Sequence, residues 1–268
     1  MKLILDKNLE NLIYNYYKKY YKNDLGLKDW QNRIKLRLDE ENNFSQDRNV
    51  KILENIYNLS FENKSILIVG SGTGGECLYF SKKQMKVEGI EPNDEANEIA
   101  NQKIKLLDLK NIKIQKGFSE NLPFKNNKFD YVYCYTVLEH VANVKKSISE
   151  MIRVLQPGGG LFICTPDYRQ FYEPHYKLPL PMFLPKIVNK ILLKIFARPT
   201  TFLDTLNLFN EKDINKILNQ HNVTATRIYE CIPKEWTKHP SFQIKIIKYI
   251  TIKFGIHKNQ YWFIKKNL

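Results

Sequence analysis

The stretch Ser65–Gly75 constrains the fold of this chain most strongly, because an apolar run leads directly into a glycine-rich loop. Four apolar residues, 66–69, precede four glycines at Gly70, Gly72, Gly74 and Gly75. A short apolar run of this kind is typical of a buried parallel strand that leads into a tight turn and a helix. Glycines let the backbone approach a ligand closely, and a helix N-terminus offers N–H groups to a carboxylate or phosphate. The stretch therefore predicts a nucleotide-like ligand.

The spacing of these glycines fits two classes of cofactor. Gly70, Gly72 and Gly75 match the G-x-G-x-x-G of dinucleotide-binding folds. Gly70, Gly72 and Gly74 match the G-x-G-x-G of proteins that bind S-adenosylmethionine. An acidic residue about 20 positions further on is expected to bind a ribose hydroxyl, and Glu91 lies there. Both cofactors carry an adenosine ribose, so Glu91 does not distinguish them.

Four downstream segments extend the pattern in a fixed order, namely Gly117–Phe124, Lys128–Tyr135, Val137–Val141 and Arg153–Ile163. Together with the glycine loop they resemble class I S-adenosylmethionine-dependent methyltransferases, particularly the group that includes quinone-biosynthesis methyltransferases. The likeness covers roughly residues 50–166. It implies the doubly wound α/β fold of the family and its cofactor, S-adenosyl-L-methionine, and it leaves the substrate open.

The resemblance also implies roles for residues at the cofactor. In the family, the glycine loop holds the methionine part and the acidic residue after the second strand holds the ribose. Residues after the third strand flank the adenine, and the fourth strand ends near the reactive methyl group. The matching positions are, in that order, Gly70, Ser71, Gly72 and Gly74; Glu91 and Pro92; Phe118 and Ser119; and Cys134 and Tyr135.

Two positions depart from the pattern of the family. Ile68 stands where a carboxylate usually helps to organise the methionine ammonium, and Ser119 stands where an acidic residue commonly meets the adenine amine. Glu120 or Glu139 can substitute for the missing acids. Two alternatives therefore stay open. One is a non-catalytic relic of the fold, and the other is an NAD-dependent oxidoreductase, which the downstream motifs do not favour.

Length and composition indicate a folded chain with one main domain and additions. The 268 residues are 43% hydrophobic, and no uninterrupted apolar run reaches the roughly 18 residues of a membrane span. The first residues become polar too soon for a secretory signal. The 4 cysteines lack Cys-x-x-Cys spacing, which indicates reduced thiols rather than a metal or disulfide site. We therefore expect a cytoplasmic protein.

Strands and helices alternate in the expected order of elements, which predicts a parallel sheet covered on both faces. The expected strands are 65–70, 86–91, 111–116, 129–134 and 160–165, and the helices among them are 74–83, 93–107 and 143–155. A helix at 211–220 and strands at 223–231 and 261–265 complete a doubly wound, mostly parallel seven-stranded α/β sheet. The expected units are a helical extension (1–60), a cofactor-binding core (61–170), a basic cap (171–210) and a C-terminal completion of the sheet (211–268).

Two histidines are the candidate catalytic residues. Methyl transfer to a hydroxyl requires loss of its proton, for which an imidazole is a suitable base. His140 follows Glu139 after the fourth strand, and His175 lies among tyrosines and Glu173 in the loop after the fifth. Alternatively, His140 only caps the next helix and shapes the pocket, and Glu173 either orients His175 or lies at the surface. No metal-ligand motif is recognised, and we expect no metal.

Positive charge is concentrated outside the predicted core. The net charge is +14, of which residues 171–203 carry +4 and residues 234–268 carry +7. Residues 184–196 place apolar side chains at helical spacing, with Lys186, Lys190 and Lys194 four apart beside them. This basic amphipathic helix predicts either a lid over the acceptor site, which we favour, or a helix that lies on an anionic membrane.

The function predicted from the sequence is methyl transfer to an oxygen of a small or carrier-linked metabolite, such as a sugar of a surface polysaccharide precursor or a quinone-like phenol. An anionic carrier, such as a nucleotide or lipid phosphate, suits the basic cap. Nucleic acid is an unfavoured partner, because the lysines are diffuse, the arginines do not cluster and no RNA-binding module is recognised. If the amphipathic helix binds lipid, we expect peripheral contact with the inner face of the membrane.

Overall fold

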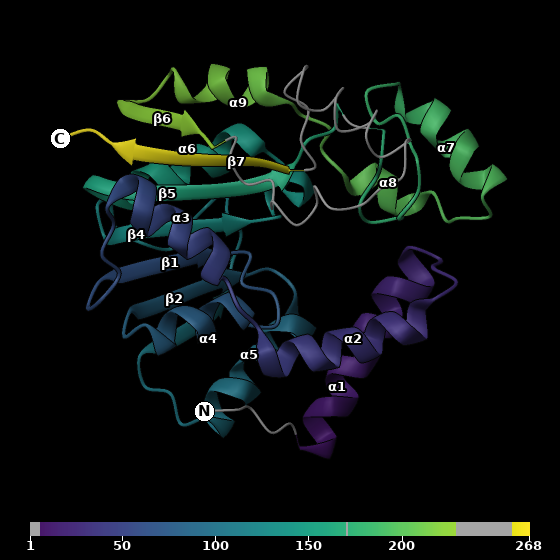
Figure 1. Cartoon of the computed structure of the whole chain (residues 1–268), viewed down its shortest axis with the longest axis horizontal. Helices are drawn as coiled ribbons and strands as arrows, with labels where there is room; N and C mark the ends of the chain where they lie inside the picture. The colour runs from purple at the N-terminus through teal and green to yellow at the C-terminus, as the bar shows by residue number, and fades with distance from the viewer. Residues whose placement is uncertain (1–5, 170, 229–258) are drawn as a thin grey trace.

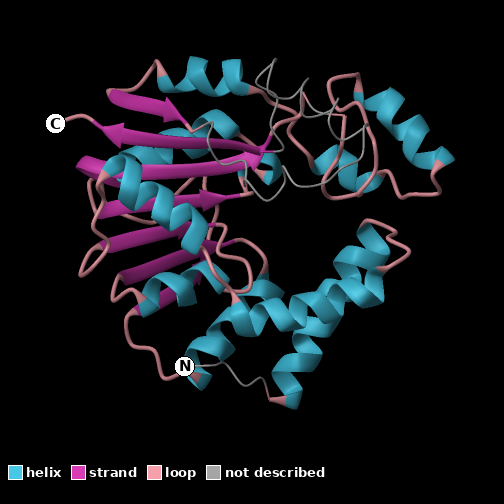
Figure 2. Cartoon of the chain, in the orientation of Figure 1, coloured by secondary structure: helices cyan, strands magenta, loops and turns pink. Residues whose placement is uncertain are grey.

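The computed structural model describes residues 6–169, 171–228 and 259–268, which contain a seven-stranded sheet (Figures 1 and 2). Its strands are β1 (Ser65–Val69), β2 (Lys86–Glu91), β3 (Ile112–Lys116), β4 (Phe129–Tyr135), β5 (Leu155–Pro166), β6 (Val223–Arg227) and β7 (Asn259–Lys266). They lie in the order β3-β2-β1-β4-β5-β7-β6. Strands β1–β5 are parallel, and β7 is antiparallel to both of its neighbours. The expected doubly wound, mostly parallel sheet is confirmed.

Helices precede the sheet and connect its strands. They are α1 (Lys7–Lys18), which continues into the π-helical turn η1 (Lys19–Asp24), α2 (Trp30–Asn43), α3 (Asp47–Tyr57), α4 (Gly75–Lys82), α5 (Asp94–Leu106), the 3₁₀ turn η2 (Leu138–His140), α6 (Val144–Val154), α7 (Lys186–Ile195), α8 (Thr201–Thr205) and α9 (Glu211–Leu218). The expected helical N-terminal extension is therefore present.

The predicted element boundaries agree with the structure to within a few residues, apart from the fifth strand. The sequence favours a start at residue 160, because Pro157 and the glycines after it are typical of a loop, but β5 begins at Leu155. This segment runs beside β4, where Phe129 pairs with Leu155 before the register shifts. The end of the predicted strand 223–231 and most of the basic region 234–268 lie outside the described residues.

The side chains of β1 alternate between two hydrophobic cores, one on each face of the sheet. Leu67 and Val69 belong to the core that includes α6 and α9, whereas Ile66 and Ile68 belong to the core that includes α3 and α4. The strand order runs outward from β1 to β3 and then returns to β4 beside β1. Ligands in such sheets bind at the carboxyl ends of the strands near this switch point.

The N-terminal helices and the cap meet in a third hydrophobic cluster. Leu25 and Ile34 from the N-terminal region share this cluster with Leu193 from α7. The rings of Tyr20 and Phe202 also meet there, with their centroids 5.8 Å apart. Figure 1 shows α1, α2, α7 and α8 on the right, beyond one end of the sheet. The two additions to the core therefore contact each other beyond the sheet rather than lying apart.

Helix α7 packs on a face that differs from the one expected. Ile187, Ile191 and Ile195 are 64%, 54% and 71% exposed, whereas Asn189 and Leu193 are buried. The apolar stripe expected from the sequence is therefore only partly packed on the domain. Leu193, which is not one of the regularly spaced apolar residues of that stripe, lies in the third hydrophobic cluster with Leu192 beside it, and this packing leaves the three isoleucines facing outward. The lid over the acceptor site stays a prediction.

A buried ion pair joins the N-terminal helices to the glycine loop. The ammonium of Lys103 on α5 contacts the carboxylate of Glu41 on α2 and donates to the carbonyl oxygen of Thr73 at 2.8 Å. The hydroxyls of Thr73 and Tyr17 donate to Glu41 Oε1 at 2.7 and 3.1 Å. Burial lowers the pKa of Lys103, and the opposing attraction of Glu41 favours its charged form. Each charge in this buried pair therefore depends on the other.

We predict that Lys103→Met destabilises the fold by about 3–5 kcal/mol, because it leaves the Glu41 carboxylate buried without a counter-ion. The free energy of unfolding in urea measures this loss. In Lys103→Met/Glu41→Leu both charges are gone, so most of the stability should return. Lys110→Met is the matched control, because the Lys110–Asp108 pair is exposed at the surface. Equal losses in Lys103→Met and Lys110→Met would contradict the role of the buried pair.

Candidate functional site

The loop after β1 folds back over the end of β2. The N–H groups of Gly70 and Ser71 donate to the carbonyl oxygen of Ile90 at 2.8 and 3.0 Å. Gly70 has a φ of +69°, a conformation that favours glycine. A Cβ atom added at Gly70 would lie 2.3 Å from Cγ2 of Val137. The loops that follow β1 and β4 are therefore in direct contact at the switch point.

Gly72 faces open space, because a Cβ atom added there would meet nothing within 4 Å. Its N–H donates to Glu91 Oε2 at 2.9 Å, and the N–H of Asn93 donates to Oε1 at 2.9 Å. Burial raises the pKa of Glu91, although both hydrogen bonds oppose this effect. The buried hydroxyl of Ser71 has no hydrogen-bond partner among the described residues. An open backbone beside a buried carboxylate and an unpaired hydroxyl fits an adenosyl ligand.

At the place expected to bind the adenine, a phenylalanine ring is exposed and a serine hydroxyl already has hydrogen-bond partners. Phe118, two residues after the end of β3, is 59% exposed and offers a flat surface for stacking. Ser119 Oγ lies 2.7 Å from Ser147 Oγ and 3.1 Å from Glu120 Oε2. Glu120 Oε1 also accepts hydrogen bonds from the N–H groups of residues 142–143. Glu120 therefore holds the loop before α6, which does not favour it as the substitute for the missing acid.

Three further residues that were expected to bind the cofactor lie at the ends of β2 and β4. Pro92 is exposed in the turn after β2. Cys134 is fully buried in the core with α6, and burial raises the pKa of its thiol. Tyr135 points to the opposite face and stacks on Tyr133 with the ring centroids 6.1 Å apart. The expectation that Cys134 lines the methionine side is corrected, because only its backbone can face a ligand. Ile68 is buried in the α3–α4 core and leaves no carboxylate there.

Both candidate histidines lie in one cluster with two buried glutamates. Glu139 and His140 come from η2 after β4, whereas Glu173 and His175 come from the loop after β5. The imidazole centroids of His140 and His175 are 5.2 Å apart. His175 Nδ1 lies 2.6 Å from Glu173 Oε1, and the N–H of Tyr176 donates to Glu173 Oε2 at 2.6 Å. Of the two interpretations of Glu173, this contact favours the one in which it orients His175.

Burial controls the charge states within the cluster. Glu139 is fully buried, which raises its pKa to about 7, an effect that His175 and Thr165 partly offset. Partial desolvation by the surrounding side chains, followed by repulsion from His175, lowers the pKa of His140, although part of this residue stays exposed to solvent. His140 therefore carries an uncharged imidazole at neutral pH, with a lone pair available to a proton or a cation.

The cluster of the two histidines and two glutamates lies beside the glycine loop, because Val137 contacts the loop and directly precedes η2. The side chain of Val137 packs against Gly70, and η2 with Glu139 begins at the next residue. Tyr168 lies close enough to the cluster for the charges of Glu139 and Glu173 to raise its pKa, although its burial is the larger cause. The Tyr168 hydroxyl has no partner among the described residues. A second ligand bound at this cluster could thus form hydrogen bonds with several polar side chains.

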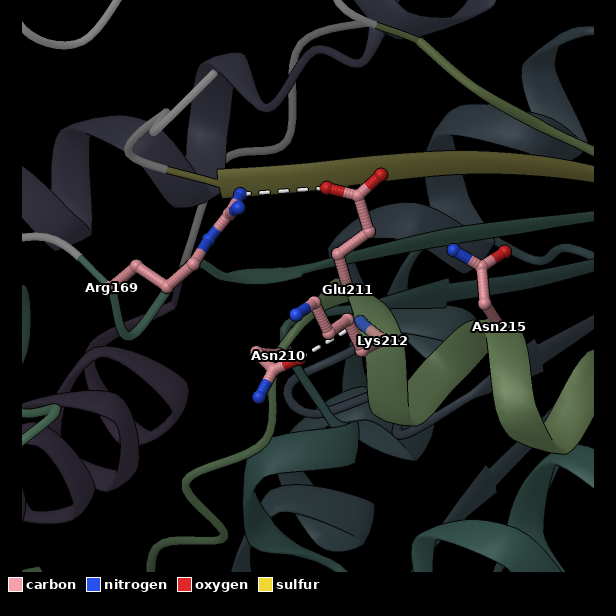
Figure 3. Close-up of a pocket in the computed structure, with 5 residues that line it drawn as sticks. All are labelled: Arg169, Asn210, Glu211, Lys212 and Asn215. Atoms are coloured by element: carbon pink, nitrogen blue, oxygen red, sulfur yellow. Dashed lines mark hydrogen bonds and ion pairs between the residues drawn. The ribbon is translucent and has the colours of Figure 1, made fainter. Parts of the chain in front are cut away.

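A separate hollow of about 460 Å³ lies between the loop after β5 and the start of α9 (Figure 3). It is lined by Arg169, Asn210, Glu211, Lys212 and Asn215. Arg169 pairs with Glu211 at 3.5 Å and with Asp167 at 2.6 Å, so its charge is engaged in structure. None of the site residues expected from the sequence lines this hollow. We therefore place the functional site at the glycine loop and the histidine cluster.

Sequence reasoning missed the residues that support the loop from behind. Lys103 carries a recognisable signal, because it continues the buried stripe of Ala96, Ile99 and Ala100 at helical spacing on α5. A lysine at such a position indicates a buried partner. No comparable signal marks Glu41, which comes from a largely polar helix distant in sequence.

Comparisons with known proteins agree with this geometry. Residues 67–163 match a family model described as a methyltransferase domain. A demethylmenaquinone methyltransferase of Staphylococcus saprophyticus is 28% identical over 155 residues, which cover 53% of this chain and 61% of the relative. Another, from Tropheryma whipplei, is 30% identical over 129 residues, covering 48% and 53%. The chain therefore spans only 61% and 53% of the length of these two relatives.

Solved structures share the fold at low sequence identity. The YcgJ protein of Bacillus subtilis has a TM-score of 0.52 at 18% identity, covering 77% of this chain and 93% of that protein. An S-adenosylmethionine-dependent methyltransferase of Aquifex aeolicus has a TM-score of 0.52 at 19% identity, covering 82% and 93%. Geranyl diphosphate C-methyltransferase of Streptomyces coelicolor, in complex with S-adenosyl-L-homocysteine, has a TM-score of 0.52 at 16% identity, covering 81% and 76%. At these identities the likeness shows the fold.

Proposed function

The chain belongs to the class I S-adenosylmethionine-dependent methyltransferase family, and on this premise we propose that it transfers a methyl group to a hydroxyl oxygen. The acceptor is a small or carrier-linked metabolite. The observation that carries the proposal is the contact of Val137 with Gly70, since it sets the cofactor loop beside the histidine cluster. A methyl donor and a hydroxyl acceptor bound at these two places would be neighbours.

Residues of the glycine loop and at the ends of β2 and β3 fit the cofactor, and each has a separate task. Glu91 would accept hydrogen bonds from the ribose hydroxyls, Gly72 leaves room for the methionine part, and Phe118 would stack on the adenine. The bound cofactor supplies a methyl group on a sulfonium, which needs no further activation. The protein therefore has to align the acceptor with that methyl group and to exclude water.

A hydroxyl acceptor must also lose its proton as the new bond forms. The cluster of Glu139, His140 and His175 is placed to promote this loss. Glu173 accepts the hydrogen bond from His175 Nδ1 and so leaves Nε2 of the same ring for the acceptor side. Glu173 is a positioning residue, because it acts through the imidazole.

We predict that S-adenosylmethionine and S-adenosylhomocysteine bind to the purified chain, whereas NAD does not. Isothermal titration calorimetry measures all three. Because burial raises the pKa of Glu91, affinity for the cofactor should fall on acidification at a pH above the ordinary glutamate value of about 4.3. Glu91→Gln should lower the affinity about 10–100-fold, since each hydrogen bond to a charged group contributes about 1.5–3 kcal/mol, and should remove this pH dependence.

Glu88→Gln is the matched control for Glu91→Gln, because Glu88 lies on the same strand and pairs with Lys128 at 2.5 Å. Its cofactor affinity should stay at the level of the unmodified chain. Binding of NAD in place of S-adenosylmethionine would overturn the proposal in favour of an oxidoreductase. Binding of neither would favour the non-catalytic alternative.

We predict that His175→Ala lowers kcat by about 10²–10⁴-fold, the usual contribution of proton transfer, and leaves the Kd for S-adenosylmethionine unchanged. Formation of S-adenosylhomocysteine with a panel of phenolic, quinol and sugar acceptors measures turnover. His221→Ala is the control, because His221 contacts Ser149 on α6, away from the cluster. Near-normal turnover of His175→Ala would remove this residue from the reaction.

A quinone-like phenol with an apolar tail is the acceptor class that we propose first. The curated relatives named demethylmenaquinone methyltransferase support a quinone-related acceptor. The exposed apolar stripe of α7 supports one that is held at a lipid surface. A sugar precursor on an anionic lipid or nucleotide carrier is the second class, and the basic residues of the cap support it.

We further propose that α7 brings the site to an anionic membrane surface. Ile187, Ile191 and Ile195 form an outward stripe, and the exposed Lys194 lies beside it. Lys190 pairs with Asp204 at 2.7 Å on the side toward the domain. An apolar stripe flanked by lysines suits the boundary between acyl chains and anionic headgroups. No helix among the described residues has the length and apolar character to cross a bilayer.

We predict that the chain sediments with vesicles that contain anionic phosphatidylglycerol and that high salt weakens this binding, because the lysine contribution is screened. Ile191→Glu should reduce the sedimented fraction severalfold at low salt, since it places a charge in the stripe. Leu106→Glu is the matched control, because Leu106 is an exposed leucine, 45% accessible, on α5. Equal sedimentation of both variants would contradict the membrane proposal.

A further inference from the structure

We propose that Glu139, His140 and His175 bind one divalent transition-metal cation of the Zn²⁺ type. The sequence shows no metal-ligand motif because these residues come from two separate loops, after β4 and after β5. The expectation of no metal therefore gives way to a specific site. Two imidazoles and one carboxylate are a ligand set that suits Zn²⁺ and its neighbours in the transition series, not Mg²⁺.

The geometry of the three side chains suits a shared cation. One ligand atom of each residue lies within 4.8 Å of the corresponding atoms of the other two. A tetrahedral Zn²⁺ site with bonds of about 2.0–2.2 Å requires ligand atoms roughly 3.4 Å apart. Side-chain adjustments of about 1 Å would therefore close the site, without movement of the strands that carry the loops.

The buried carboxylate of Glu139 gives an independent reason to expect a ligand. Glu139 is fully buried, and Thr165 Oγ1 donates to its Oε2 at 3.1 Å. Its Oε1 has no hydrogen-bond partner within the described ranges. A buried carboxylate oxygen without a partner is costly, and a bound cation would remove that cost. His140 is exposed, which gives a cation a route into the cluster.

Glu173 completes the arrangement behind the site. It is fully buried, and its Oε1 lies 2.6 Å from His175 Nδ1. A carboxylate that accepts from one imidazole nitrogen fixes the tautomer and leaves the other nitrogen as a metal ligand. The N–H of Tyr176 donates to the second oxygen of Glu173 and holds the carboxylate in place. His175 is therefore oriented as ligands in metal sites commonly are.

Three protein ligands leave an open coordination position, which is typical of a catalytic site. This consequence rests on the proposed function: an acceptor hydroxyl at the open position would lose its proton more readily. The O–H bond would break with its electron pair on oxygen and its proton passed to water. The oxygen would then form a bond to the methyl carbon of the sulfonium as the carbon–sulfur bond breaks with its electron pair on sulfur, which releases S-adenosylhomocysteine. His175 then acts as a ligand and not as the base.

Metal binding is testable without any methyl acceptor. The full chain is treated with chelator, dialysed and titrated with ZnCl₂ in a calorimeter and with CoCl₂ by visible absorption. We expect one cation per chain and a Co²⁺ spectrum typical of low coordination number. Glu139→Gln and His175→Ala should abolish the Co²⁺ band at one equivalent. Glu173→Gln, which removes no ligand, should lower the affinity about 10–100-fold.

His221→Ala and the double variant His239→Ala/His257→Ala are the controls for unspecific binding to the other histidines of the sequence. Both should bind Co²⁺ like the unmodified chain. Loss of binding in these controls, or unchanged binding in Glu139→Gln and His175→Ala with native circular dichroism, would overturn the proposal. Calorimetry with S-adenosylmethionine on the chelated chain keeps the two proposals separable: a chain that binds the metal but not the cofactor refutes only the proposed function.

Discussion

The Lys103–Glu41 ion pair is the interaction on which the rest of the site depends. It joins α5, α2 and the Thr73 carbonyl at a point that water does not reach. Buried charges are costly unless they are paired and hydrogen-bonded, and here both conditions hold. The position of the glycine loop is therefore set by the core of the sheet on one side and by the N-terminal helices on the other. A displacement of those helices would therefore shift the glycine loop, because Glu41 connects the two.

The second constraint is the contact between Gly70 and Val137, which couples the two halves of the site. No larger residue fits at position 70, since its Cβ would overlap the valine side chain. The loop after β4 therefore cannot shift toward the cofactor without displacing the loop after β1. This contact explains how residues of η2 keep a fixed place relative to Glu91, although they come from different strands. The distance between the glycine loop and the histidine cluster is thus set by packing rather than by a flexible loop.

The sequence predicted the sheet well because its signals are local. Apolar runs such as Ile66–Val69 and the glycines that follow them report strands and turns within a few residues. The cluster of Glu139, His140 and His175 was not predictable as a unit, because only the fold brings the ends of β4 and β5 side by side. Each histidine was a candidate by itself, yet no local pattern shows that the two rings meet.

The orientation of α7 and the place of Cys134 were hidden for a related reason. Helical spacing identified an amphipathic segment, but its core-facing side depended on Leu193, whose partners lie in the N-terminal helices. Likewise, a position at the end of β4 does not reveal which face of the sheet receives the side chain. Alternation along β4 sends Cys134 into one core and Tyr135 into the other. In both cases the packing of the whole fold determined which side of the element faces the core.

The position of β7 has a consequence for how the protein folds. β6 precedes β7 in the chain, yet in the described sheet it bonds only to β7, which separates it from β5. During synthesis β5 therefore keeps an open edge, and residues 223–227 stay unpaired, until residues 259–266 emerge. Open strand edges attract other chains, and pairings between distant segments form slowly. Assembly of the described sheet thus ends when β7 pairs with β5 on one side and with β6 on the other, and until that late step nascent chains are exposed to aggregation.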